Sequence, residues 1–295
     1  MKMLSTTLSA YRRGRPLPEV AAVIEGLNAK RMQACVSVLP AFSFGPAELE
    51  AEKRKHLGIL PFLAVGGLSA DLTIRLSRFG RHRDLRGCIE ARDEIAAHCA
   101  DHRAFLWVDM EQSSTVDLTL EAFDDIARRR DNVGVCLQTC LRRTERDLDW
   151  LLKDRRPVRL VKGGYRERAP IAFDTWHETT WAFGQLIRPL IERSRRPAIG
   201  THDPRLIEEA KQALASRRSP QTSGGPPETG AESAALEFQF YLGAKPHLAE
   251  ALAAEGHPVR ITIPHGALVP YALHAWPSMD VSRQLQRALG LRTIR

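Results

Sequence analysis

Short apolar runs rich in β-branched residues recur along the whole chain, and amphipathic helical stretches separate them. This alternation predicts a parallel sheet, because parallel strands need a crossover connection and a helix is the usual one. Eight strand–helix units in 295 residues favour a closed (β/α)₈ barrel of the TIM type over an open sheet, since closure leaves no unpaired edge. The eight runs that we interpret as strands are Met32–Leu39, Leu72–Ser77, Ala104–Asp109, Val133–Gln138, Val158–Lys162, Ala198–Thr201, Leu236–Phe240 and Val259–Ile263.

The stretches between these runs predict the outer ring of the barrel. Thr119–Arg130 and Trp181–Arg193 carry apolar residues at helical spacing and should cover the strands. Between the first two strands, the charged residues Glu48–Lys55 suggest a short exposed helix, followed by the apolar run Gly58–Val65. Ser216–Ser233 is rich in Gly, Pro, Ser and Thr and predicts a flexible loop. We expect one barrel domain over residues 1–295.

Composition and charge narrow the class of protein. With 43% hydrophobic residues the chain can bury a sizeable core, and no apolar run is long enough to span a membrane or form a signal peptide, so we expect a cytoplasmic protein. The five cysteines form no CxxC pair, which argues against a disulfide framework or a metal site. The net charge of +8 comes largely from arginines without interleaved aromatic residues, and we expect no nucleic-acid binding.

The segment Arg159–Tyr165, which reads RLVKGGY, is the sharpest local feature. A lysine at a strand end beside a glycine, here Lys162 and Gly163, allows the backbone to approach an anionic or planar ligand closely. The alternative is that Arg159 and Lys162 belong to a buried ion pair. A third possibility is a Schiff base at Lys162, as in class I aldolases, which would make the protein a lyase without a flavin.

Two further strand ends carry polar groups. At residues 199–204 a strand ends in Thr201 and His202, and Asp203 with Pro204 can begin the next helix, whose first N–H groups suit a phosphate. At residues 107–111 Asp109 can pair with Arg75, and Glu111 could serve as well. A structural salt bridge across the barrel mouth explains these carboxylates equally well.

Taken in order, these pieces resemble the proline dehydrogenase family over residues 27–276. The resemblance rests on VDME at Asp109, GVCLQ ending at Gln138, RLVKGGY, GTHDP, Glu237–Gln239, and VRITIPHG before Pro270 and Tyr271. It implies a distorted (β/α)₈ barrel that binds FAD without a Rossmann fingerprint. It also implies that Arg159 lies near the isoalloxazine ring, where a cation stabilises the electron density that arrives on reduction. The residues that would hold the FAD are Gln138, Arg159, Lys162, Gly163, Thr201, His202 and Gln239.

On the substrate side, the resemblance implies that proline gives a hydride to the flavin and becomes a cyclic imine. Asp109, Tyr165 and Tyr271 match substrate positions. Arg75 stands where the family has a lysine, and Thr262 stands where it has a tyrosine.

The largest departure is in the last helix, where the family has an adjacent Arg-Arg pair that grips the substrate carboxylate. This chain has His274 and Ala275 there, and only a protonated His274 could replace part of that charge. Three alternatives follow: an enzyme for proline or hydroxyproline, an enzyme for another cyclic or secondary amine, or a non-catalytic flavin-binding homologue.

The resemblance further implies a membrane quinone as electron acceptor. The charge of +8 suits transient contact with the inner face of an anionic membrane. The sequence does not set an oligomeric state.

Overall fold

A computed structural model describes residues 15–39, 46–76, 85–165, 167–218 and 235–266. Eight parallel strands close into a barrel in chain order, as expected, and β1 pairs with β8 from Gln33 opposite Arg260 to Val38 opposite His265. The strands are β1 Gln33–Val38, β2 Asp71–Arg75, β3 Leu106–Asp109, β4 Val133–Gln138, β5 Val158–Val161, β6 Pro197–Gly200, β7 Glu237–Tyr241 and β8 Val259–His265.

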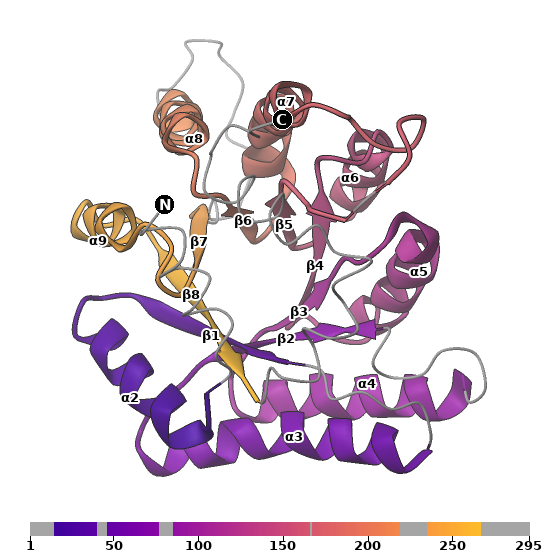
Figure 1. Ribbon diagram of the computed structural model, residues 1–295, viewed down its shortest axis with the longest axis vertical. Coiled ribbons are helices and arrows are strands. Elements are labelled where there is room, and N and C mark those ends of the chain that lie inside the picture. The colour runs from indigo at the N-terminus through magenta and orange to yellow at the C-terminus, as the bar shows by residue number, and fades with distance from the viewer. Residues whose placement is uncertain (1–14, 40–45, 77–84, 166, 219–234, 267–295) are drawn as a thin grey trace, which may run out of the picture.

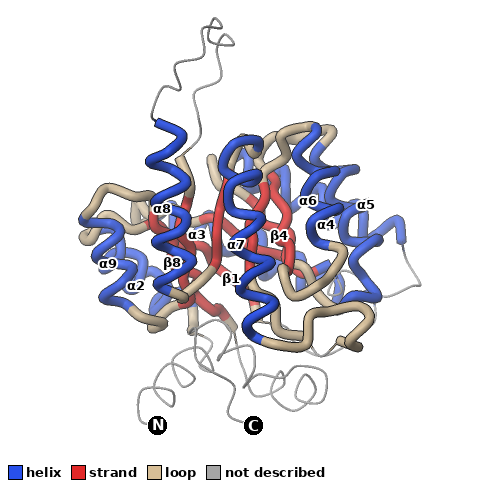
Figure 2. Tube along the Cα trace, turned by 90° about the horizontal axis from the view of Figure 1, so that it is seen from above, coloured by secondary structure: helices blue, strands red, loops and turns tan. Residues whose placement is uncertain are grey.

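Helices surround the barrel on all sides of the view in Figure 1, and Figure 2 shows the strands enclosed by them. Within the described residues the helices are α2 Leu17–Asn28, α3 Pro46–Val65, α4 Leu85–Asp101, the 3-10 turn η2 Ser113–Thr115, α5 Val116–Ala127, α6 Thr144–Lys153, α7 Trp176–Arg193, α8 Pro204–Arg218 and α9 Pro246–Ala254. Helix α7 begins with a capping box in which Thr175 and Glu178 each bond the other's backbone. No helix in these ranges is both long enough and apolar enough to cross a membrane.

Successive side chains of each strand point alternately toward the surrounding helices and into the lumen of the barrel. Aliphatic side chains such as Val36, Leu72 and Leu160 face the helices and form the main hydrophobic core. The alternate positions face the lumen, where Trp107 and Phe105 form a separate small cluster with Cys35 and Ala198. The lumen is otherwise lined largely by polar and charged side chains.

Helix α3 corrects one expectation. It is a single continuous helix that includes both the charged residues 48–55 and the apolar run after them, whereas the sequence suggested a short exposed helix. Ile59 and Leu63 are buried against the core, as are His56 and Glu52 one and two turns earlier on the same face. The helix is continuous because these side chains form one stripe at helical spacing.

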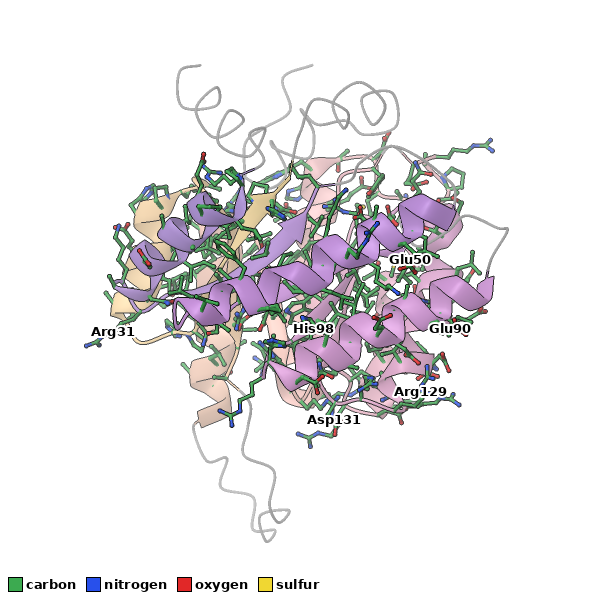
Figure 3. All side chains as sticks on the ribbon, turned by 90° about the horizontal axis from the view of Figure 1, so that it is seen from below. Arg31, Glu50, Glu90, His98, Arg129 and Asp131 are labelled. Carbon is green, nitrogen blue, oxygen red and sulfur yellow. The ribbon has the colours of Figure 1, made fainter. Side chains whose placement is uncertain are left out.

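Helices α3 and α4 lie side by side (Figure 3), with Glu50 on α3 and Glu90 and His98 on α4. Lys53 of α3 joins the two helices, since its Nζ lies 3.0 Å from Glu50 and 2.8 Å from Glu94 of α4. Helix α8 extends to Arg218, so residues 216–218 of the expected loop are helical. The rest of that expected loop, from residue 219 on, lies outside the described residues.

Candidate active site at the carboxyl ends of the strands

The polar residues singled out from the sequence come from neighbouring strands and lie near the ends where the strands finish. Arg75 and Asp109 are the last residues of β2 and β3, Gln138 is the last of β4, and Lys162 and Thr201 directly follow β5 and β6. All strands are parallel, so these ends share one face of the barrel.

Arg159 of β5 is the central cation of this face. Its Nη1 donates to Oε1 of Gln239 at 3.0 Å, its Nη2 donates to Oδ1 of Asp109, and its guanidinium lies 5.1 Å from the centre of the Trp107 ring. The side chain is buried, and its Nε has no hydrogen-bond partner among the described residues. Burial by itself lowers the pKa of Arg159, but the neighbouring Cys136 and Asp109 raise it above its usual value. Arg159 is therefore a permanent cation.

Asp109 lies between two arginines. Besides Arg159, the Nε of Arg75 approaches its Oδ2 at 3.5 Å, so the ion pair expected between strands 2 and 3 is present. Asp109 and Arg75 both keep 17% of their side-chain surface exposed, whereas Arg159 keeps 7%. The pair therefore lies nearer to solvent than Arg159.

Lys162 belongs to a second cluster, which α7 and α8 complete. Its Nζ donates to Oδ2 of Asp203 and to Oγ1 of Thr180, both at 2.9 Å, and lies 4.6 Å from the centre of a Trp176 ring. The side chain is only 3% exposed. A Schiff-base lysine has to be uncharged and open to a carbonyl compound, whereas Asp203 favours the ammonium form. This geometry counts against the lyase alternative.

Gln138 and Gly163 touch across β4 and β5. The Nε2 of Gln138 donates to the backbone oxygen of Glu111 at 2.6 Å. Gly163 has a φ of 82°, and a Cβ there would lie 2.8 Å from Oε1 of Gln138 and 2.5 Å from Sγ of Cys140. Both the backbone conformation and the space therefore require glycine at this position.

Thr201 and His202 lead into α8. The backbone N–H of Asp203 donates to Oγ1 of Thr201 at 3.2 Å, and that of Arg205 donates to Oδ1 of Asp203 at 3.1 Å. Asp203 is thus the expected N-cap, but its carboxylate already satisfies an N–H group that we expected to be open to a phosphate. His202 is buried, and its Nε2 accepts from the backbone N–H of Tyr241 at 3.1 Å.

The remaining expected site residues are less central. Tyr165 lies half-buried in the segment between β5 and α7. Tyr271 and His274 lie outside the described residues. The structure therefore joins Arg75, Asp109, Arg159 and Gln239 into one network. Lys162 and Thr201 share a second cluster through Asp203, and Gln138 lies in a third contact with Gly163.

Sequence reasoning missed the charged layer beneath this face. Arg260 of β8 donates to both carboxylate oxygens of Glu237 at 2.9 Å, and its Nη1 lies 3.2 Å from Oδ2 of Asp71. Arg196 binds the same Asp71 oxygen at 2.8 Å. A signal was available: Glu237 precedes Gln239 by two residues and Asp71 precedes Arg75 by four, so each pair shares the lumen side of its strand.

A groove on the outer surface, between α5 and α6, is distinct from this face. The described residues that line it include Leu120, Trp150 and charged side chains of both helices. Its lining comes from the helices and from the loop between β4 and α6, outside the barrel lumen.

The chain is similar to known proline dehydrogenases over most of its length. The family model described as proline dehydrogenase matches residues 21–272. The chain is 27% identical over 244 residues to proline dehydrogenase 2 of Bacillus subtilis, which covers 82% of this chain and 76% of that protein. It is 26% identical over 260 residues to a proline dehydrogenase of Deinococcus radiodurans, which covers 86% of this chain and 79% of the relative.

Solved structures share the fold. Proline utilization A from Bdellovibrio bacteriovorus, inactivated by N-propargylglycine, superposes with a TM-score of 0.78 at 18% identity and covers 96% of this chain. The protein of the same name from Corynebacterium freiburgense superposes with a TM-score of 0.73 at 17% identity and covers 98%. The chain spans 32% of the length of each of these two proteins. At this identity the likeness concerns the fold.

Proposed function

The chain belongs to the proline dehydrogenase family, and from this premise we propose that it is an FAD-dependent oxidoreductase that oxidises proline or a related cyclic or secondary amine to an imine. A bound FAD would supply the two-electron acceptor for this reaction. The observation that carries the proposal is Arg159, a buried permanent cation at the carboxyl ends of the strands. The lyase alternative has no comparable support, because the ammonium of Lys162 is already held by Asp203 and Thr180.

The residues present suit a flavin. The buried Nε of Arg159, without a partner among the described residues, offers an N–H donor, and the guanidinium charge suits a ring system that gains electron density. Gly163 lets the side chains of Gln138 and Cys140 pack directly against the backbone after β5, in the space that a Cβ would fill, and so helps to hold Gln138 at this face. Gln138, Lys162, Gly163, Thr201, His202 and Gln239 would hold the cofactor together with Arg159.

The substrate would lie toward the more exposed pair Arg75 and Asp109. Asp109 holds Arg75 and Arg159 near each other, so it orients two cations at once. Tyr165 and Tyr271 complete the proposed substrate side, with His274 in place of the first family arginine. With only His274 to replace the paired guanidinium groups, we expect weak recognition of a free carboxylate. The substrate test therefore has to include proline and also cyclic amines without a free carboxylate.

We propose one barrel domain in the cytoplasm that passes its electrons to a membrane quinone. The net charge of +8 supports transient contact with the anionic inner face of the bilayer.

The decisive experiment is an anaerobic visible spectrum of the purified protein, saturated with FAD, before and after addition of L-proline and then of a panel of cyclic amines. Bleaching with proline supports a proline dehydrogenase, and bleaching only with other amines redefines the substrate. A protein that takes up flavin but is bleached by none of them supports the non-catalytic alternative. A protein that takes up no flavin overturns the proposal.

A variant tests the role of Arg159. We expect Arg159→Ala to lower FAD occupancy or the rate of flavin reduction, because it removes the buried cation of the site. The control is Arg156→Ala, which removes a partly buried arginine that donates to Asp124 and to the backbone oxygen of Ala127 outside the lumen. Equal flavin uptake and reduction in the two variants would remove Arg159 from the site.

A further inference from the structure

The lumen contains a continuous chain of hydrogen bonds that connects the charged layer at its amino end to the proposed flavin side. Glu237 accepts from Arg260 at 2.9 Å and from Nε2 of Gln239 at 2.6 Å. Gln239 in turn accepts from Arg159 at 3.0 Å through its Oε1. All four side chains are buried. These hydrogen bonds therefore cross the lumen entirely inside the protein.

This arrangement sets the direction of one amide. Gln239 can present either its oxygen or its NH₂ group to Arg159, and only the oxygen can accept from a guanidinium. The carboxylate of Glu237 holds the NH₂ group on the opposite side, because an ionised carboxylate can only accept. Glu237 remains ionised because Arg260 binds it through two parallel hydrogen bonds, which is the strongest geometry for such a pair.

The side chain of Arg159 depends on this amide. Its Nη2 is held by Asp109 and its Nη1 by Gln239, and these two contacts fix the plane of the guanidinium over Trp107. If the amide of Gln239 turned around, an NH₂ group would face Arg159 and the Nη1 contact would be lost. The guanidinium would keep Asp109 but lose the contact that holds its Nη1, and its orientation over Trp107 would be less fixed.

We propose that Glu237, two residues before Gln239 on β7, is a positioning residue for the flavin side of the site, because it fixes the amide of Gln239 and thereby the guanidinium of Arg159. The inference rests on the proposed function in one respect, namely that Arg159 contacts a flavin. Glu237 itself touches neither cofactor nor substrate.

The test compares Glu237→Gln with Asp71→Asn. Both changes replace one carboxylate by an amide in the same charged layer, and both leave Arg260 one carboxylate partner. Only Glu237 contacts Gln239, so a general loss of charge or stability should affect both variants alike, whereas a loss of positioning should affect only the first. We expect FAD to bind Glu237→Gln about fivefold more weakly than Asp71→Asn, the factor expected for one hydrogen bond of ordinary net strength.

A double-mutant cycle gives a second measure of the same contact. Gln239→Met removes the middle member of this series of hydrogen bonds and leaves Glu237 bound to Arg260. If the effect of Glu237 passes through Gln239, the double variant should bind FAD no more weakly than Gln239→Met alone. If Glu237→Gln does not fold, Glu237→Asp takes its place, because it keeps the charge for Arg260 and shortens the reach to Gln239 by one methylene.

The outcomes separate the two proposals. Wild-type protein that takes up no FAD contradicts the proposed function. Wild-type protein that binds FAD, with equal affinities in Glu237→Gln and Asp71→Asn or additive effects in the cycle, leaves the flavin site standing and overturns the role of Glu237. Circular dichroism and thermal unfolding of each variant show whether it is folded under the conditions of the titration.

Discussion

Replacing Gly163 by alanine should damage both the stability of the barrel and the proposed flavin site. Gly163 has a φ of 82°, which costs an L-residue about 1 kcal/mol. Its new Cβ would also lie 2.5 Å from Sγ of Cys140 and 2.8 Å from Oε1 of Gln138. Overpacking of this kind costs about 1–3 kcal/mol, so we expect a total loss of about 3 kcal/mol in the free energy of unfolding.

Two other glycines separate these contributions. Gly256 has a φ of 86° and nothing within 4 Å of its Cβ position, so Gly256→Ala should cost only the backbone strain, about 1 kcal/mol. Gly134 lies in β4, and a Cβ there would lie 2.7 Å from Cζ3 of Trp107. Its substitution should cost only the steric part, about 2 kcal/mol.

The assay is denaturant unfolding of the three variants without FAD, followed by FAD titration. In thermal unfolding the midpoint should fall by about 2 °C for each kcal/mol in a chain of this length. Gly163→Ala should also weaken FAD binding, because the Cβ displaces the amide of Gln138, whereas Gly256→Ala should not. If Gly163→Ala is no less stable than Gly256→Ala, the close packing of Gln138 and Cys140 against Gly163 is not a constraint and the steric argument is refuted.

Other predictions concern charge and substrate. Burial lowers the pKa of His56 from 6.5 to about 4. The stability that the neutral, buried His56 contributes is therefore complete above pH 6.5 and is lost as the pH falls toward 4. In denaturant unfolding, the wild type should lose about 2 kcal/mol more stability than His56→Gln between pH 7 and pH 5. Asp203→Asn leaves the buried Lys162 without its carboxylate and should lower the free energy of unfolding by about 3 kcal/mol. The control Asp131→Asn breaks an exposed pair with Arg195 and should change the unfolding midpoint little. Equal effects of the two changes would contradict the argument that the buried pair matters more. The double change His274→Arg with Ala275→Arg should raise proline turnover in steady-state assays, and no gain would leave the missing arginine pair without consequence.

The strand pattern could be predicted from the sequence because it depends on local features. Each β-branched apolar run became a strand, and β4 has the predicted bounds Val133–Gln138. The pair of Arg75 and Asp109 was also predictable, since both residues end adjacent parallel strands. Helix α3 was predicted wrongly, because its charged residues suggested exposure, whereas His56 and Glu52 are buried in it.

By itself, the sequence determined that the chain forms a parallel barrel and that polar residues gather at the carboxyl ends of its strands. Both features depend on patterns in consecutive residues: the apolar runs that form strands, the helical stretches between them, and the polar residue at the end of each strand. Only the tertiary structure decided which of these residues meet. Arg159 bonds Gln239 although 80 positions separate them, and Arg260 bonds Gln33 across the closure of the barrel. Such pairings depend on how eight strands are aligned around one closed lumen, and the pattern of a single strand does not say which residues of other strands lie beside it.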